Sequence, residues 1–389
     1  MTRDMKNWKF YLLIFAMMVA CKKPYNPTVI DSPKSYLIVE GVINTNDTTT
    51  IKISRTVKLS SKTTNNPVEA NVSVESDNGE SYGLYESAPG IYKLDGTFLD
   101  SSHKYRLHIT TINENNEYRS DFVAAKNAPP IDSIGYALTA KGIQIYANAH
   151  DATRNTRYYR FDYTETWKFH SLYNSGWVSN GVEIVPRPGD QQVYYCFKSA
   201  SSSSILLGST AKLTQDFLFQ TPITTIDATS EKLETKYSIL LKQYALTEDA
   251  YKFWETLRKN TEQLGSIFDA EPTQLAGNIH NIKDNSEVVI GFISAGAIAT
   301  KRIFIANEQL PGNFFPVYPY ECALDSNWFS DPHTINGLNE VQAVLIPGIE
   351  IPVSAFYKGG PLPAGFLGSD QYCVDCTLRG SSKQPDFWK

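Results

Sequence analysis

The sequence predicts a mainly β protein, and three observations lead to that class. Tyr and Phe are abundant, with 23 and 19 residues, and they occur among many Val, Ile and Thr, the residue types that favour strands. Apolar and polar residues alternate with period two in many short runs, as they do in half-buried strands. Gly, Asn and Pro separate these runs at intervals of about eight to twelve residues, which is typical of β-sandwiches.

Residues 1–20 precede the β region and have the three parts of a signal peptide. Basic residues open the segment, an apolar run follows from Phe10 to Ala20, and Cys21 stands next. The apolar run is shorter than the roughly twenty residues that a membrane-spanning helix needs. A small residue directly before a cysteine is the lipobox pattern, so we expect cleavage before Cys21 and a lipid on its thiol. An ordinary signal peptide and an uncleaved anchor are the alternatives.

Residues 21–34 are polar and rich in proline, so we expect a lipidated, extended tether there. Each buried methylene of an acyl chain adds about 0.8 kcal/mol of membrane affinity, and two or three chains therefore anchor a protein firmly. The sequence thus predicts attachment to a membrane through the lipid on Cys21.

Residues 35–126 are predicted to form an Ig-like or transthyretin-like sandwich. Alternating runs such as Tyr36–Ile43 and Lys104–Thr110 follow one another closely, and Asp77-Asn78-Gly79 is strong hairpin chemistry because Asn and Gly tolerate positive φ. The spacing resembles the regulatory sandwich of carboxypeptidases, a module that is usually structural and performs no chemistry.

A second β-rich domain is predicted for residues 131–358, after a stiff proline linker. Long alternating runs such as Gly142–Ala149 indicate its strands. A helical insertion is predicted at about 247–264, because Thr247 can cap it, acidic residues suit its first turn, and apolar residues recur at helical spacing.

Five cysteines occur in the chain, and four of them follow Cys21. An even set in an exported protein indicates disulfides, and four cysteines allow three pairings. We expect two disulfides that tie residues 359–389, an irregular C-terminal tail, onto the second domain. The Cys373–Cys376 spacing also fits half of a zinc site or a redox pair, but the chain lacks a second close ligand pair and a thioredoxin-like unit. The four candidates are Cys196, Cys322, Cys373 and Cys376.

Known catalytic signatures are absent from the sequence, including HExxH, GxSxG, the Walker A loop and GxGxxG after a strand. The six histidines are scattered, and the net charge of −5 with mixed acids and bases does not indicate a nucleic acid partner. We therefore expect no enzyme activity, no cofactor and no metal. Aromatic side chains in loop-like segments can stack on sugars or anchor peptides, although burial between packed segments is the alternative. The candidate contacts for a glycan or peptide ligand are Trp177, Trp328 and Trp388.

An ordered set of short blocks runs through the mature chain, including Gln243–Thr247, Gly265–Asp269, Val289–Phe292 and Cys373–Gly380. This set resembles the domain of unknown function 4249 family, which are envelope lipoproteins of Bacteroidota. The resemblance implies an outer-membrane location and a TonB-dependent outer-membrane transporter as partner, because members are commonly encoded beside such transporters. It implies no catalytic residue.

The leading functional hypothesis is thus an outer-membrane-anchored, non-enzymatic lipoprotein that is an accessory or substrate-capturing partner of a TonB-dependent barrel. A structural or assembly factor of the envelope is the alternative, and a glycan or peptide hydrolase is a third class. Lys22 and Lys23 stand where acidic residues direct related lipoproteins to the surface, so the sequence leaves the choice between periplasmic and surface-facing leaflets open.

Overall fold

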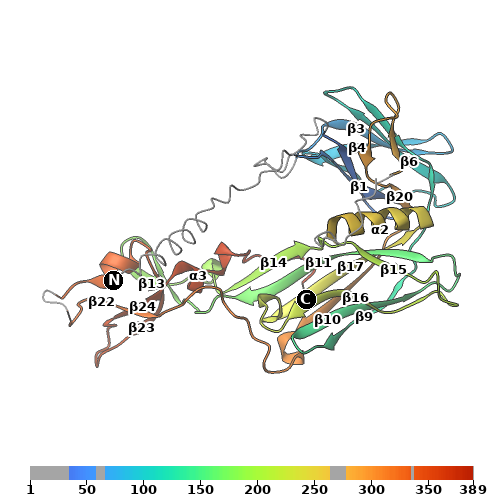
Figure 1. The fold of residues 1–389 in the computed structure, drawn as a ribbon. Coiled ribbons are helices and arrows are strands. Elements are labelled where there is room, and N and C mark those ends of the chain that lie inside the picture. Colours follow the sequence, from blue (N-terminus) through green and yellow to red (C-terminus); the bar gives the residue numbers. More distant parts are fainter. Residues whose placement is uncertain (1–34, 58–65, 263–276, 334–336, 389) are drawn as a thin grey trace, which may run out of the picture. The chain divides into compact units, whose positions relative to one another are not determined.

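A computed structural model describes residues 35–57, 66–262, 277–333 and 337–388. The predicted signal peptide 1–20, the lipidation residue Cys21 and the tether 21–34 lie outside the described residues. From Leu37 onward the chain forms one compact unit. The mainly β fold with few helices is confirmed (Figure 1). None of the helices in the described ranges has the length and apolarity needed to cross a membrane.

The N-terminal sandwich is an eleven-stranded sheet with the order β18-β7-β6-β3-β4-β5-β2-β1-β19, in which β20 also pairs with β1 and β8 with β6. Alternation decides which face is buried: Val72 and Val74 of β3 point into the core, as do Leu107 and Ile109 of β6. The strands are β1 Leu37–Asn44, β2 Thr49–Arg55, β3 Ala70–Ser76, β4 Ser81–Ala88, β5 Ile91–Leu94, β6 Lys104–Thr111, β7 Glu117–Ser120, β8 Val123–Ala124, β18 Ile279–Asn281, β19 Val289–Ile290 and β20 Ser294–Gly296.

The predicted turn at Asp77-Asn78-Gly79 joins β3 to β4 as a hairpin, with Val74 opposite Tyr82. Gly79 has a φ of 93°, which residues with a Cβ rarely adopt. The Asn78 side-chain oxygen accepts a hydrogen bond from the Glu80 amide at 3.0 Å and so closes the turn.

Three strands of the N-terminal sandwich come from far along the chain. β19 and β20 pair with β1 in parallel, with Leu37 opposite Val289 and Val42 opposite Ser294. β18 pairs with β7. Ile279 and Ile293 are buried in the same core as the N-terminal strands. The chain therefore returns to complete this core before it continues into β21.

The second sandwich packs a three-stranded sheet, β16-β10-β9, on a five-stranded sheet, β14-β11-β17-β21, in which β15 also pairs with β11. Inward residues such as Ile145, Phe161 and Leu241 form its core and are fully or almost fully buried. The strands are β9 Ile131–Leu138, β10 Gly142–His150, β11 Tyr158–His170, β14 Tyr195–Ser201, β15 Leu206–Ser209, β16 Phe217–Asp227, β17 Lys236–Leu246 and β21 Ala299–Ala306.

Helix α2, Glu248–Glu262, follows β17 directly. The Thr247 hydroxyl accepts a hydrogen bond from the Ala250 amide at 3.2 Å, so the predicted cap is present. Phe253 is buried, and the Tyr251 ring packs at a tilt against the Tyr158 ring, with centroids 4.9 Å apart. The helix therefore covers the end of the five-stranded sheet.

The remaining elements are short. A three-stranded sheet has the order β22-β24-β23, and a hairpin of β12 and β13 lies beside β23. The elements are β12 Trp177–Ser179, β13 Ile184–Pro186, β22 Asp325–Trp328, β23 Ile351–Phe356, β24 Gly365–Ser369, α3 Gln371–Val374, a π-helix Val341–Leu345, and 3₁₀ turns Gly189–Gln191, Glu231–Leu233, Asn307–Gln309 and Cys376–Leu378.

Candidate functional site

The candidate site is the C-terminal lobe, by which we mean residues 315–333 and 337–376 together with the hairpin of β12 and β13. Two small cores hold the lobe together. Val341, Leu345 and Phe366 form one of them with Trp177 of the hairpin, and Val353 and Val374 belong to the other. The lobe thus has an apolar interior of its own.

Two disulfides connect the lobe, and they confirm the expectation from the cysteine count. Cys322 bonds to Cys373 within the lobe, over a separation of 51 residues. Cys196 of β14 bonds to Cys376, over a separation of 180 residues. The two cysteines of the Cys373–Cys376 motif therefore do not bond to each other. Cys373 forms the disulfide within the lobe, and Cys376 links the lobe to β14 of the five-stranded sheet.

Two aspartates shape the turns around these cysteines. The Asp370 side chain accepts a hydrogen bond from the Tyr372 amide at 2.8 Å, and the Asp375 side chain does the same for the Thr377 amide at 2.8 Å. Such caps satisfy amides that a short helix leaves unpaired. The sequence around the motif therefore encodes two consecutive tight turns that present the cysteines to different partners.

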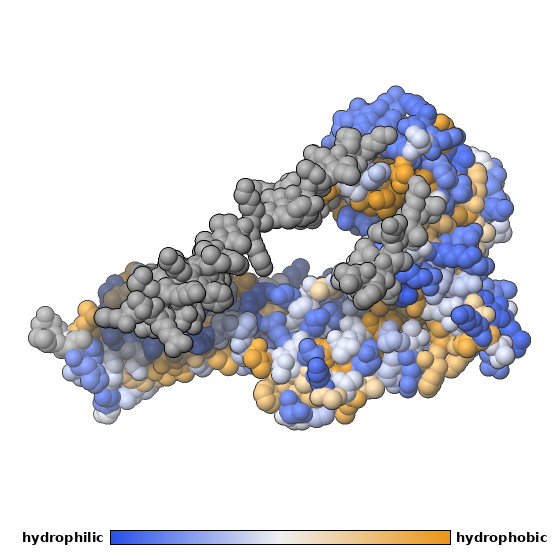
Figure 2. All heavy atoms as spheres, in the orientation of Figure 1, coloured by the Kyte–Doolittle hydropathy of each residue, from blue (hydrophilic) through white to orange (hydrophobic). Residues whose placement is uncertain are grey.

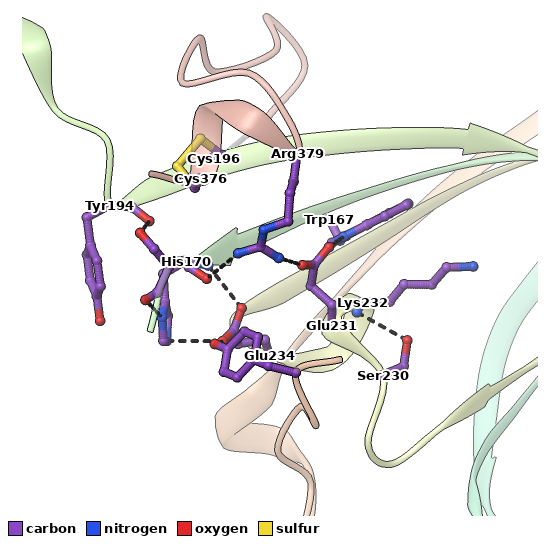
Figure 3. A network of polar contacts seen from close by, with 12 residues as sticks. Trp167, His170, Tyr194, Cys196, Ser230, Glu231, Lys232, Glu234, Cys376 and Arg379 are labelled. Carbon is purple, nitrogen blue, oxygen red and sulfur yellow. Dashed lines mark hydrogen bonds and ion pairs between the residues drawn. A yellow bond between two sulfur atoms is a disulfide. The ribbon is translucent and has the colours of Figure 1, made fainter. Parts of the chain in front are cut away.

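The segment after the lobe is held by a polar network on the acidic turn, which comprises Glu231 to Glu234 (Figure 3). The Arg379 guanidinium forms an ion pair with Glu231, and it also donates to the His170 carbonyl at 3.4 Å. The Trp167 indole N–H donates to the second oxygen of Glu231 at 3.1 Å. Both oxygens of Glu231 therefore have partners from this chain.

Glu234, at the end of the acidic turn, holds the lobe itself. Its side chain is 3% exposed and accepts hydrogen bonds from the His170 amide at 2.9 Å and from the Tyr318 hydroxyl. His170 Nε2 lies 3.4 Å from the same carboxylate. Burial and the Glu234 carboxylate raise the pKa of Tyr318, so its hydroxyl remains a neutral donor. The acidic turn thus connects the second sandwich to both the lobe and the segment after it.

The chemistry of this network is that of a structural clamp. A general acid or base must reach a substrate proton, whereas the oxygens of Glu231 and Glu234 accept from Arg379, Trp167, His170 and Tyr318. Among the described residues, no group of three or more His, Cys, Asp and Glu is placed to hold a metal ion.

The three tryptophans proposed from sequence as ligand contacts lie in different places. Trp388 is 7% exposed and packs edge-on against Phe197 and Phe304, with centroids 5.1 and 5.4 Å away. Trp177 is half-buried against Phe366 inside the lobe. Trp328 is half-buried against Phe356, and the Lys358 ammonium lies 4.6 Å from its ring. The structure therefore brings two of the three to the lobe.

The surface of the lobe is rich in exposed apolar side chains. Leu362 and Val317 are 78% and 68% exposed. Figure 2 shows hydrophobic atoms along the rim of the part that carries β22 to β24. We call the exposed apolar side chains of the lobe the apolar rim. They are Val182, Phe315, Val317, Leu324, Phe329, Leu338, Ile349, Tyr357, Leu362 and Tyr372.

Sequence reasoning missed the acidic turn and its partners. His170, Glu231 and Tyr318 are far apart in the chain, and scattered acids carry no signal in a sequence with 41 Asp and Glu. Only Arg379 had a signal, because it lies in the block Cys373–Gly380 that supported the family resemblance.

Comparison with known proteins gives one result. A family model described as "Domain of unknown function (DUF4249)" matches residues 22–302. A search of curated proteins finds no match. The matched range covers both sandwiches and ends inside β21, and most of the C-terminal lobe follows it.

Proposed function

Because the chain belongs to the domain of unknown function 4249 family, we propose that it is an outer-membrane-anchored, non-enzymatic lipoprotein that acts as an accessory or substrate-capturing partner of a TonB-dependent transporter. The lipid on Cys21 attaches it to the membrane, and the tether to residue 34 gives the folded part reach. A barrel partner then needs a firm contact surface on the folded part.

The apolar rim of the C-terminal lobe is the observation that carries this proposal. Single exposed apolar residues are common on proteins, but their concentration on one part of the molecule is typical of interaction surfaces. Ile349 and Leu362 belong to this rim, at 65% and 78% exposure. Aromatic residues and Arg are also enriched in protein interfaces, and the rim includes Phe315, Phe329 and Tyr372.

The bracing of the lobe supports a docking role. Rigid partners lose less conformational entropy on association, so a surface held by disulfides binds more tightly than a loose loop. Cys322–Cys373 closes the lobe, and Cys196–Cys376 fixes it to the sheet. The clamp of Glu231 and Glu234 serves the same purpose.

Affinity purification from the native outer membrane tests the proposal. The tagged chain is extracted in mild detergent, and co-purifying proteins are identified by mass spectrometry. We expect a TonB-dependent barrel in near-equal amount. Recovery of the chain alone, or of assembly machinery in place of a barrel, would sink the transporter proposal and favour the envelope-assembly alternative.

Charge substitutions locate the surface. Leu362→Glu and Ile349→Glu are expected to reduce barrel recovery at least several-fold, because a charge buried at an interface loses its hydration. Phe219→Glu on β16 is the matched control, since Phe219 is also strongly exposed, at 67%, but lies on the second sandwich. Equal losses for all three variants would contradict a specific role of the lobe.

A further inference from the structure

A large polar cleft lies outside the clamp and the C-terminal lobe. Its volume is about 1110 Å³, above the ~300–1,000 Å³ typical of pockets for small ligands. Strands β11, β17 and β21 contribute its floor, and helix α2, residues 201–205, and strands β1 and β2 with the turn between them also line it. The size fits a ligand built of several units.

The floor is the outward face of the five-stranded sheet, and its side chains form rows across the strands. Asp162 lies opposite Lys242, which in turn lies opposite Thr300. Thr164 lies on the same face of β11 as Asp162, two residues further along the strand, and it is opposite Ser201. Directly opposed residues have Cβ atoms about 4.5–5.5 Å apart, so acceptors, donors and hydroxyls alternate at short intervals.

Arg160 is a buried charged residue in this floor. It is 8% exposed, and its guanidinium lies between the rings of Tyr244 and Trp254, 4.4 and 4.2 Å from their centroids. One of its terminal nitrogens donates to Asp162 at 2.9 Å. Its buried Nε finds no hydrogen-bond partner in the described part of the chain. The two rings and Asp162 hold the guanidinium in one orientation beside the cleft.

The charge of the cleft disfavours an ionic ligand. Asp162 neutralises Arg160, so the guanidinium keeps unused N–H donors without a free charge. The other charged side chains nearly balance as well, and together with this pair they are the acids Glu40, Asp47, Asp162 and Glu262 and the bases Lys52, Arg160 and Lys242. Donors and acceptors of nearly zero net charge match a ligand whose groups both donate and accept, as hydroxyls do.

The topology disfavours an extended peptide. Peptides commonly bind by adding a strand to a free sheet edge. β11 and β17 are internal strands, with β14 and β21 as their outer neighbours in the sheet. These two strands therefore offer a peptide their side chains and no free backbone edge. The half-buried ring of Trp254 and the hydroxyls of residues 201–204 also suit the apolar and polar faces of a sugar.

We propose that this cleft binds a neutral oligosaccharide, with Arg160, Asp162, Lys242 and Thr300 as hydrogen-bonding residues and Trp254 as an apolar contact. This inference deepens the substrate-capture part of the proposed function, and it does not depend on a barrel partner. A failure to bind sugar and a failure to recover a barrel are therefore separate results.

Isothermal titration calorimetry on the purified full chain in mild detergent tests the inference. The neutral probes are maltohexaose, cellohexaose, xylohexaose and mannohexaose, and the comparison ligands are hexagalacturonate and tetraalanine. We expect at least one neutral hexasaccharide to bind with a micromolar to millimolar Kd and both comparison ligands to bind more weakly. Absence of binding by all four neutral probes, or tighter binding of the acidic sugar or the peptide, overturns the proposal.

Two substitutions assign the binding to the cleft. Lys242→Ala is expected to weaken the bound hexasaccharide roughly tenfold, and Thr300→Val, which keeps the shape and removes the hydroxyl, roughly threefold. Lys168→Ala is the matched control, because Lys168 lies on the same face of β11 but does not line the cleft. Unchanged affinity in Lys242→Ala and Thr300→Val, with all variants folded by circular dichroism, would place any sugar binding elsewhere and overturn the assignment.

Discussion

At the scale of single residues, a few buried carboxylates decide how the C-terminal lobe is held. Glu234 accepts from an amide and a phenol while it is almost fully buried, so each of its partners depends on it. Removing one member of such a set leaves the others unsatisfied, which costs more than the bond contributes when complete. The acidic turn is therefore the most sensitive point of the lobe attachment.

Glu234→Ala is expected to lower the free energy of unfolding by about 2–3 kcal/mol, because the Tyr318 hydroxyl and the His170 amide lose their charged acceptor. Urea unfolding monitored by tyrosine and tryptophan fluorescence measures this change. The control is Glu183→Ala in the exposed turn between β12 and β13, expected to stay within about 0.5 kcal/mol of the parent. Equal effects of both variants would refute the clamp.

Glu350 is a half-buried carboxyl group of the lobe, and folding raises its pKa. Burial raises its pKa, and the nearby carboxylates of Asp325 and Glu340 act in the same direction, against the hydrogen bond from Asn327. A carboxyl whose pKa is raised by folding favours the native state at low pH, and this contribution is lost as the pH rises through the folded-state pKa.

Glu350→Gln should therefore stabilise the protein at neutral pH by about 0.5 kcal/mol after allowance for solvent screening. The difference should vanish below the ordinary carboxyl pKa of about 4.3, where the parent is also neutral. Thermal unfolding at a series of pH values measures it. A variant that is less stable than the parent at pH 7 would show that the native site prefers the carboxylate.

At the scale of elements, the long alternating strands and the helix followed from the sequence. Gly142–His150 and α2 have a clear period, and a period decides which face is buried. Some short strands did not follow, since β18 spans only Ile279–Asn281 and is defined by pairing with β7. Disulfide pairing was open for the same reason. Non-local pairing depends on the fold, and local residue patterns do not encode it.

The Cys322–Cys373 disulfide makes an element-scale prediction. Replacing both cysteines with alanine should lower the free energy of unfolding of the lobe by about 3–4 kcal/mol, because the bond closes a loop of 51 residues. Hydrogen exchange should show lost protection in β22 to β24 and unchanged protection in β3 and β6. Uniform loss of protection in both regions would contradict a lobe that unfolds separately.

At the scale of the whole molecule, the chain passes from the N-terminal sandwich into the second one, returns to the first, and then enters the second again. β20 pairs with β1, and the chain then enters β21 of the second sandwich. The buried Gln243 side chain donates to the Pro129 carbonyl at 2.7 Å, and the Ala297 amide donates to Asn127 at 2.8 Å. The cleft with Arg160 and the lobe with its apolar rim are thus carried by one connected framework.

A fragment ending at Lys126 tests this connection. It lacks β18, β19 and β20, so Leu37 and Val39 lose core neighbours and β1 gains a free edge. We expect no cooperative unfolding transition for this fragment in a urea titration, whereas a chain that runs to Ala297 restores the missing strands. A sharp transition for the shorter fragment would mean that the N-terminal strands fold without the later ones.

We propose that the apolar rim of the lobe contacts an outer-membrane barrel, and photo-cross-linking in living cells tests this contact most directly. A photoreactive amino acid is placed at position 362 on the rim, and at position 219 on β16 as the control. The proposed function predicts a cross-link from position 362 to a TonB-dependent barrel and none from position 219. Cross-links from position 362 to assembly machinery alone, or the same barrel cross-link from both positions, would contradict it.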